Sequence, residues 1–206
     1  MSRGLLALAL TVGWYMIPAV GVSAQTQSQL LLTAEVLERN YCSKSATISL
    51  QLKVRLRYTN LSSQRLILYK GHDLFFQTKI RSETVEGVQP YVVHLINMHY
   101  FDEEFERIDA GAPGKVFVTL SPRGTFEREL IAGIGVTDHS GERSSTTVRP
   151  GRHTLHFIVS TWYQSPKLAE KLRQQWQRKG LLWSRPVLSQ PLKVEINKPA
   201  SASPCR

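Results

Sequence analysis

The residues best suited to bind a metal gather in "HLINMHYFDEE", which contains His94, Met98 and His99. Imidazole and thioether groups are ligands that suit copper. On a strand, His94 and Met98 would share one face while His99 pointed away, so the three could not converge on one ion. The acidic run that follows, Asp102 to Asp109, lacks the ligand spacing of a calcium loop. We therefore expect a strand followed by a solvated acidic loop, with no metal and no cofactor.

A second group, Asp138, His139 and Ser140 in "TDHSGE", has the residue types of a hydrolase triad. Such triads are assembled from distant segments, whereas these three are neighbours on a stretch that ends in glycine. The sequence also lacks the G-x-S-x-G, H-E-x-x-H, P-loop and C-x-x-C motifs. We expect a turn here, and a protein that is not an enzyme.

Basic and aromatic residues gather in "SPKLAEKLRQQWQRKGLLW", which begins at Ser165. Ser165 is a good N-cap, Pro166 suits the first helical position, and Gly180 is a natural stop, so a helix is expected over about 165–180. Leu168, Ala169, Leu172 and Trp176 fall on one side of that helix. Leu168, Leu172 and Trp176 are expected to turn inward.

Three basic residues, Lys167, Lys171 and Arg178, fall on a different side of this helix, and Trp162 and Trp183 flank it. Together they form a candidate surface for an anionic partner or a carbohydrate, since tryptophan offers a large apolar face with one donor. The alternative is that the apolar side only packs and the basic residues only face water.

The two cysteines, Cys42 and Cys205, are expected to form one disulfide that joins an early strand to the tail. A zinc site would need more ligands at close spacing. The tail, residues 197–206, is rich in proline, serine and alanine and is expected to be irregular.

The first 24 residues, "MSRGLLALALTVGWYMIPAVGVSA", combine one positive charge at Arg3, an apolar stretch and a small-residue exit at Ala24. This layout is typical of a secretory signal peptide that is cleaved after Ala24. The alternative is a retained membrane anchor, which a glycine and a proline within the stretch disfavour. Cleavage would leave residues 25–206 as one domain without a transmembrane span, secreted or periplasmic.

The chain of 206 residues carries 26 basic and 16 acidic residues, a formal net charge of +10. A basic protein outside the cytoplasm seldom meets nucleic acid. Its electrostatic partners would instead be anionic envelope polymers, lipid head groups or acidic proteins.

Most of the remaining sequence predicts β-strands. In "TISLQLKVRLRYTN", residues 47–60, apolar and polar residues alternate, which is typical of a half-buried strand in an antiparallel sheet. The turn "NLSSQ" and the apolar run from Leu66 to Tyr69 predict a hairpin with that strand. Further strands are expected at 74–81, 91–96, 115–120, 126–136, 153–163 and 192–196. The pattern predicts an all-β antiparallel sandwich, with the helix inserted before the last strand.

Two further signals lie on and after the 47–60 strand. Lys53, Arg55 and Arg57 alternate along it as a basic stripe, which is usually a solvated sheet face. Asn60-Leu61-Ser62 fits the acceptor pattern for N-glycosylation.

Two segments resemble those of immunoglobulin-like domains. "VRPGRHTLHFIV" resembles the "P-G-x-Y-x-L" entry to their penultimate strand, with His153 in place of the usual tyrosine. "RLRYTNLSSQRLILYKG" resembles their strand-turn-strand segments with "Y-x-N-x-S". As a whole, the chain resembles uncharacterised exported bacterial proteins with an immunoglobulin-like β-sandwich. The resemblance implies that the His153 imidazole donates the hydrogen bond of the tyrosine corner.

Two functions follow as expectations. The first is a secreted or periplasmic, non-catalytic binding or adhesion module of the cell envelope. The alternative is an inhibitor of exported proteases that presents a loop from an immunoglobulin-like scaffold.

Overall fold

The computed structural model describes residues 29–44, 47–70, 76–82, 92–97, 117–137, 147–160, 162 and 166–205. These residues are mostly in strands, with one helix, α1, and the sheets pack against each other. The expected all-β class is therefore confirmed. The predicted signal peptide, residues 1–24, lies outside the described residues.

One layer is built from three long antiparallel strands: β1 (Leu30–Lys44), β2 (Thr47–Asn60) and β7 (Thr125–Val136). β2 lies in the middle and pairs along its whole length with both neighbours. Two short strands run parallel to the outer members: β13 (Ser203–Pro204) beside β1 and β8 (Thr147–Val148) beside β7.

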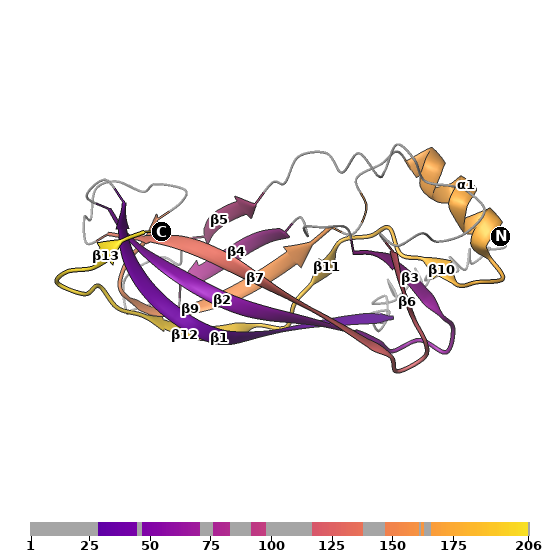
Figure 1. Ribbon diagram of the computed structural model, residues 1–206, viewed down its shortest axis with the longest axis horizontal. Helices are drawn as coiled ribbons and strands as arrows, with labels where there is room; N and C mark the ends of the chain where they lie inside the picture. Colours follow the sequence, from indigo (N-terminus) through magenta and orange to yellow (C-terminus); the bar gives the residue numbers. More distant parts are fainter. Residues whose placement is uncertain are drawn as a thin grey trace, which may run out of the picture.

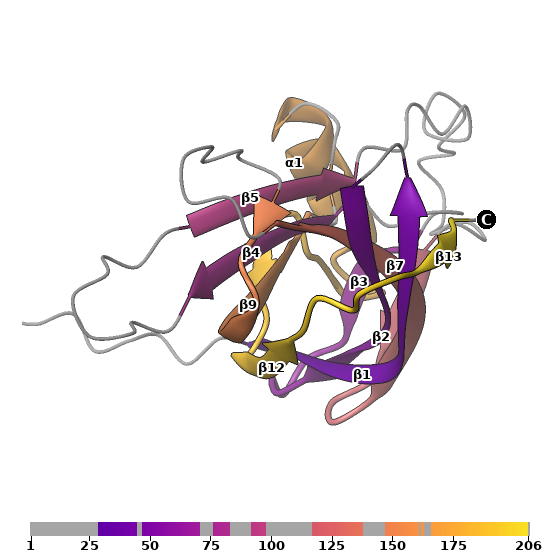
Figure 2. The same ribbon diagram turned by 90° about the vertical axis from the view of Figure 1, so that its left-hand side faces the viewer.

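The facing layer is centred on β9 (Gly151–Val159). On one side β9 pairs antiparallel with β4 (Phe76–Ser82), which in turn pairs with β5 (Val92–Asn97). On the other side it pairs with β11 (Val187–Leu188) and β12 (Leu192–Ile196). Figure 2 shows these strands facing β1, β2 and β7, with the core between the two layers.

The alternation along β2 and β9 produces this core. On β2 the apolar residues from Leu50 to Tyr58 are buried, while the residues between them face outward. On β9, in the facing layer, Leu155, Phe157 and Val159 are buried in the same core. The expected half-buried strand at 47–60 is thus confirmed, because each layer turns only one face to the core.

β1 was absent from the strands that the sequence predicts. Its pairing with β2 shifts between Val36 and Glu38, so that an extra residue interrupts the alternation. Before this bulge Glu35 lies opposite Arg55 on the outer face, and after it Glu38 lies opposite Lys53. The alternation of inward and outward side chains therefore shifts by one residue within β1. A search of the sequence for strict alternation misses such a strand.

The predicted hairpin between β2 and the run from Leu66 to Tyr69 is wrong. That run is β3, which pairs antiparallel with β6 (Phe117–Leu120) and parallel with β10 (Leu181–Leu182) in a separate small sheet. All four residues of β3 are buried. Because β3 is buried on both faces, it does not extend the sheet of β2, whose outer face is exposed.

The helix α1 (Pro166–Trp176) covers the small sheet at one end of the molecule (Figure 1). It follows β9 and precedes β10, β11 and β12, so the excursion lies where the sequence predicts it. Gly180 ends the turn after the helix with a φ of 154°, where other residues are strained. A Cβ at this position would lie 2.9 Å from the Arg65 carbonyl oxygen.

Candidate functional site

The inner face of α1 is buried in a second apolar cluster. Leu172 and Trp176 are buried as predicted; Ala169 is also buried, whereas Leu168 is only half-buried. The Trp176 ring meets the edge of Phe117 with 5.1 Å between ring centroids. Side chains from three strands and the helix complete this cluster: Ile67, Tyr69, Phe117, Leu182, Ala169, Leu172 and Trp176.

Two of the basic side chains predicted as a partner surface lie on the outer face of α1, and the third lies in the turn after it. Lys167, Lys171 and Arg178 are all exposed. At 3.6 residues per turn Lys167 and Lys171 lie about 40° apart, on the side away from Trp176. The helix ends at Trp176, earlier than the predicted 165–180, so Arg178 lies in the turn that follows it. Within the described part of the chain, none of the three forms an ion pair. The three residues, which we call the helix stripe, are therefore exposed and unneutralised, two on the helix and one just beyond its end.

Arg173 has a different role on the same helix. Its guanidinium forms an ion pair with Glu170 at 3.1 Å and hydrogen bonds with the Ser184 hydroxyl and the Leu182 carbonyl oxygen. These contacts hold the helix against the segment that contains β10. Arg173 and Glu170 neutralise each other, which leaves the positive charge of the outer face to Lys167 and Lys171.

The two tryptophans do not extend this surface as predicted. Trp183 is only 5% exposed and belongs to the main core, so its assignment to the partner surface is wrong. Its backbone N–H donates to the Ile67 carbonyl oxygen and its ring N–H to that of Arg185, which fixes it inside the fold. Trp162 is half-buried against the second apolar cluster.

The stripe of basic residues on β2 is neutralised on the outer face of its sheet. Lys53 lies 3.2 Å from Glu129, and Arg57 lies 2.6 Å from Glu127. Arg55 contacts both carboxylates and also Glu35 on β1. The sequence showed only the basic half of this ladder, because its acidic partners lie on β1 and β7.

The ladder shifts the pKa values of two of its members in opposite directions. Hydrogen bonds from Lys53 and then from Arg55 lower the pKa of Glu129. Hydrogen bonds to Glu129 and Glu38 raise the pKa of Lys53. Each group is therefore held in its charged form by its neighbours, and this face is a poor binding site for a further anion.

Asn60, which begins the acceptor pattern for N-glycosylation, is a structural residue in this fold. The side chain is fully buried, and its nitrogen donates to three carbonyl oxygens, those of Gln64, Leu120 and Ser121. Its oxygen accepts from the backbone N–H and the hydroxyl of Ser62. A glycan would have to be attached to the nitrogen that these bonds engage. The Asn-x-Ser pattern instead turns the chain from β2 into β3.

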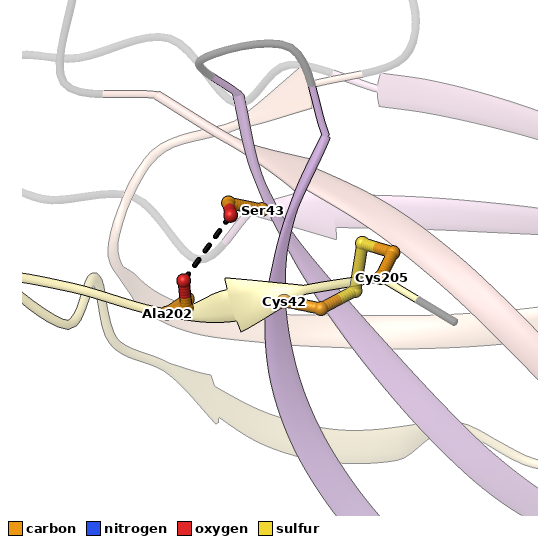
Figure 3. Close-up of a disulfide and its surroundings, with 4 residues drawn as sticks. All are labelled: Cys42, Ser43, Ala202 and Cys205. Carbon is orange, nitrogen blue, oxygen red and sulfur yellow. Dashed lines mark hydrogen bonds between the residues drawn. A yellow bond between two sulfur atoms is a disulfide. The ribbon is translucent and has the colours of Figure 1, made fainter.

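The predicted disulfide between Cys42 and Cys205 is confirmed (Figure 3). The two Cα atoms are 4.7 Å apart, within the range that a disulfide spans. The Ser43 hydroxyl donates to the Ala202 carbonyl oxygen at 3.1 Å, and the Cys205 N–H donates to the Ser43 carbonyl oxygen. The tail is therefore less irregular than expected, because β13 pairs with β1.

The other candidate chemistry falls largely outside the described residues. This holds for Met98, His99, the acidic run 102–109 and the group 138–140, as well as for the His94 side chain. Among the residues that the structure does describe, no three His, Cys, Asp or Glu side chains are grouped to hold a metal ion. No described helix has the length and apolar character to span a membrane.

Comparison with known proteins does not place this chain in a family. No family model matches the chain, and no curated protein is significantly similar to it.

Proposed function

We propose that this protein is an exported, non-catalytic binding module of the cell envelope, and that the helix stripe binds an anionic partner. The observation that carries the proposal is the contrast between two basic stripes. Carboxylates on neighbouring strands neutralise the stripe on β2, whereas Lys167, Lys171 and Arg178 form no ion pair with any described residue. Unneutralised positive charge on a solvent-facing helix attracts anionic polymers or acidic proteins.

Two features support export. The N-terminal 24 residues have the layout of a secretory signal peptide. The disulfide belongs to an oxidising compartment such as the periplasm or the extracellular space. Both features are consistent with a protein that meets envelope components and not nucleic acid.

The proposal includes an immunoglobulin-like sandwich, which the strand pairing supports. Immunoglobulin-like domains pair their strands as A-B-E in one sheet and as C-F-G in the other, with an extra strand beside C in the variable type. The orders β1-β2-β7 and β12-β9-β4-β5 follow this scheme. His153 Nε2 lies 2.7 Å from the Arg149 carbonyl oxygen, four residues upstream, where a tyrosine corner places its hydroxyl.

The test compares two variants that lower the net charge equally. One removes the helix stripe (K167S/K171S/R178S), and the matched control removes three exposed cations elsewhere (R39S/R152S/K193S). Binding to anionic polymer from envelope extract should weaken strongly for the stripe variant and little for the control. Wild-type binding should fade as the salt concentration rises, because exposed charges are screened. Equal binding by the two variants would refute the assignment of this surface.

The alternative function, an inhibitor of exported proteases, remains a prediction. It requires a preformed loop that resists cleavage, and the segments 83–91 and 98–116, which flank β5, lie outside the described residues. Incubation of the wild-type protein with proteases from the same envelope extract separates the two functions. Stoichiometric loss of protease activity would favour the inhibitor.

A further inference from the structure

Three turns meet at the end of the molecule that α1 covers (Figure 1). They are residues 61–65 after β2, residues 121–124 between β6 and β7, and residues 177–179 after α1. They come from distant parts of the sequence, and the fold makes them neighbours.

Hydrogen bonds and close backbone packing connect these turns. The Asn60 side chain donates to the carbonyl oxygens of Gln64 and Ser121 and so joins the first two turns. The Arg65 carbonyl oxygen accepts from the Leu181 N–H, and a Cβ added to Gly180 would lie 3.1 Å from the Arg65 Cβ. The third turn is therefore packed against the first.

Each turn presents one exposed arginine: Arg65, Arg123 and Arg178. In the described part of the structure, none of these arginines has a carboxylate partner. Leu61 lies on the first turn and is 53% exposed; among the described residues it is one of three exposed large apolar side chains, with Ile131 and Leu188. We call these four residues the basic tip.

A basic surface around an exposed leucine fits one partner better than the others. A soluble polyanion or an acidic protein would use the arginines and leave the leucine in water. An anionic bilayer uses both, because head-group phosphates attract the arginines while the apolar side chain enters the boundary with the acyl chains.

The start of the described chain lies at the same place. The Gln29 carbonyl oxygen accepts a hydrogen bond from the Leu61 N–H at 2.8 Å. The described chain therefore begins beside the basic tip.

We propose that the basic tip, formed by Leu61, Arg65, Arg123 and Arg178, docks this protein on an anionic phospholipid surface. The inference rests on the proposed function and specifies its partner. Arg178 connects the two, because it belongs both to the basic tip and to the group with Lys167 and Lys171. In this arrangement the helix end of the molecule faces the membrane, while β13 lies at the opposite end (Figure 1).

The test is cosedimentation with vesicles of phosphatidylglycerol and phosphatidylcholine, with phosphatidylcholine alone for comparison. The protein recovered from its host should bind only the anionic vesicles. R65S/R123S/R178S should lose on the order of 100-fold in affinity, since each basic side chain near an anionic surface gives roughly a fivefold gain. L61S should lose about fivefold, in proportion to the apolar surface that the bilayer no longer covers. R39S/R152S/K193S is the charge-matched control and should retain most of the binding.

Soluble polyglutamate distinguishes the lipid surface from other anions. L61S should bind polyglutamate as the wild type does, while the arginine variant should not. If L61S also binds vesicles as tightly as the wild type, or if the arginine variant matches the control, the membrane proposal is overturned. A wild-type protein that binds polyglutamate but no vesicles would overturn it and leave the proposed function intact; binding to neither would overturn both. Circular dichroism melts of each variant show whether it has folded.

Discussion

Different interactions stabilise the two ends of this molecule. At the helix end, α1 lies on a small sheet, and their contact is an apolar cluster that includes Trp176 and Phe117. At the other end, the tail after β12 is largely exposed and is held by the Cys42–Cys205 bond and a few backbone hydrogen bonds. Apolar packing stabilises one end, and a covalent bond stabilises the other.

This difference predicts how each end responds to damage. Apolar packing stabilises the folded state locally, because the buried side chains touch only their neighbours. A disulfide acts mainly by restricting the unfolded chain, so its energy belongs to global unfolding. Damage at the helix end should therefore appear as local opening, whereas loss of the disulfide should lower global stability and leave the folded sheets in place.

The largest effect is expected from removing the disulfide. The C42S/C205S variant opens a loop between residues that are 163 apart in sequence. In the chain-entropy model a loop of this size contributes roughly 5 kcal/mol, which is an upper figure. Urea unfolding of the variant and the oxidised wild type measures the difference. If both unfold at the same urea concentration, the bond constrains only the tail and the comparison of the two ends fails.

Trp176→Ala should have the next largest effect, because it empties the centre of the helix-end cluster. We expect a loss of about 4 kcal/mol, typical of a buried tryptophan. Amide exchange should accelerate in α1, β3, β6 and β10 while β2 and β7 keep their protection. Ile131→Ala is the control, since Ile131 is 64% exposed and its loss should change stability by less than about 0.5 kcal/mol. Equal acceleration in β2 and β7 would mean that the two clusters unfold as one unit.

The sequence predicted the features of each end that depend on local signals. The helix was predictable because its start, its stop and its apolar face all lie within one segment. The disulfide was predictable because the chain has only two cysteines. By contrast, the cluster under the helix draws on β3, β6 and β10, and no sequence pattern shows that these distant segments meet.

The incorrect predictions have the same physical origin. Trp183 looked like part of a surface because it follows the helix, but its pairing beside Ile67 turns it into the core. The stripe on β2 looked basic because its carboxylates come from other strands. The exposed positions of Lys167 and Lys171 follow from helical periodicity. Arg178 lies beyond the last helical residue, and its neighbours at the basic tip depend on tertiary structure.

Asn60→Ala tests the connection between the sandwich and the helix end. The substitution removes a buried donor from three carbonyl oxygens and the acceptor of the Ser62 N–H. The Gln64 and Ser121 oxygens each keep one other donor, the Ser62 hydroxyl and the Gly124 N–H. A cost of roughly 3 kcal/mol is expected, from the upper part of the range for unsatisfied buried groups. Ser62→Ala removes a single hydroxyl and should cost about 1 kcal/mol, which makes it a graded control. Thermal unfolding measures both; an Asn60→Ala variant as stable as Ser62→Ala would show that water replaces the lost bonds.

The smallest effect is expected from the exposed ladder, which belongs to neither end. Glu129→Gln removes a carboxylate whose pKa lies below its usual 4.5, because Lys53 and then Arg55 donate hydrogen bonds to it. A lowered pKa means that the charged form favours folding, so this contribution is present above about pH 4.5 and is lost as the pH falls through the native pKa. The pKa of Lys53 is raised above 10.5, so its contribution is present below that pH and is lost as the pH rises further. The wild type should therefore exceed the variant slightly in urea midpoint near neutral pH and converge with it in acid, and added salt should shrink the gap. A gap that widens in acid would mean that the Glu129 carboxylate opposes folding, and the ladder would then be a source of strain on the sheet that joins the two ends.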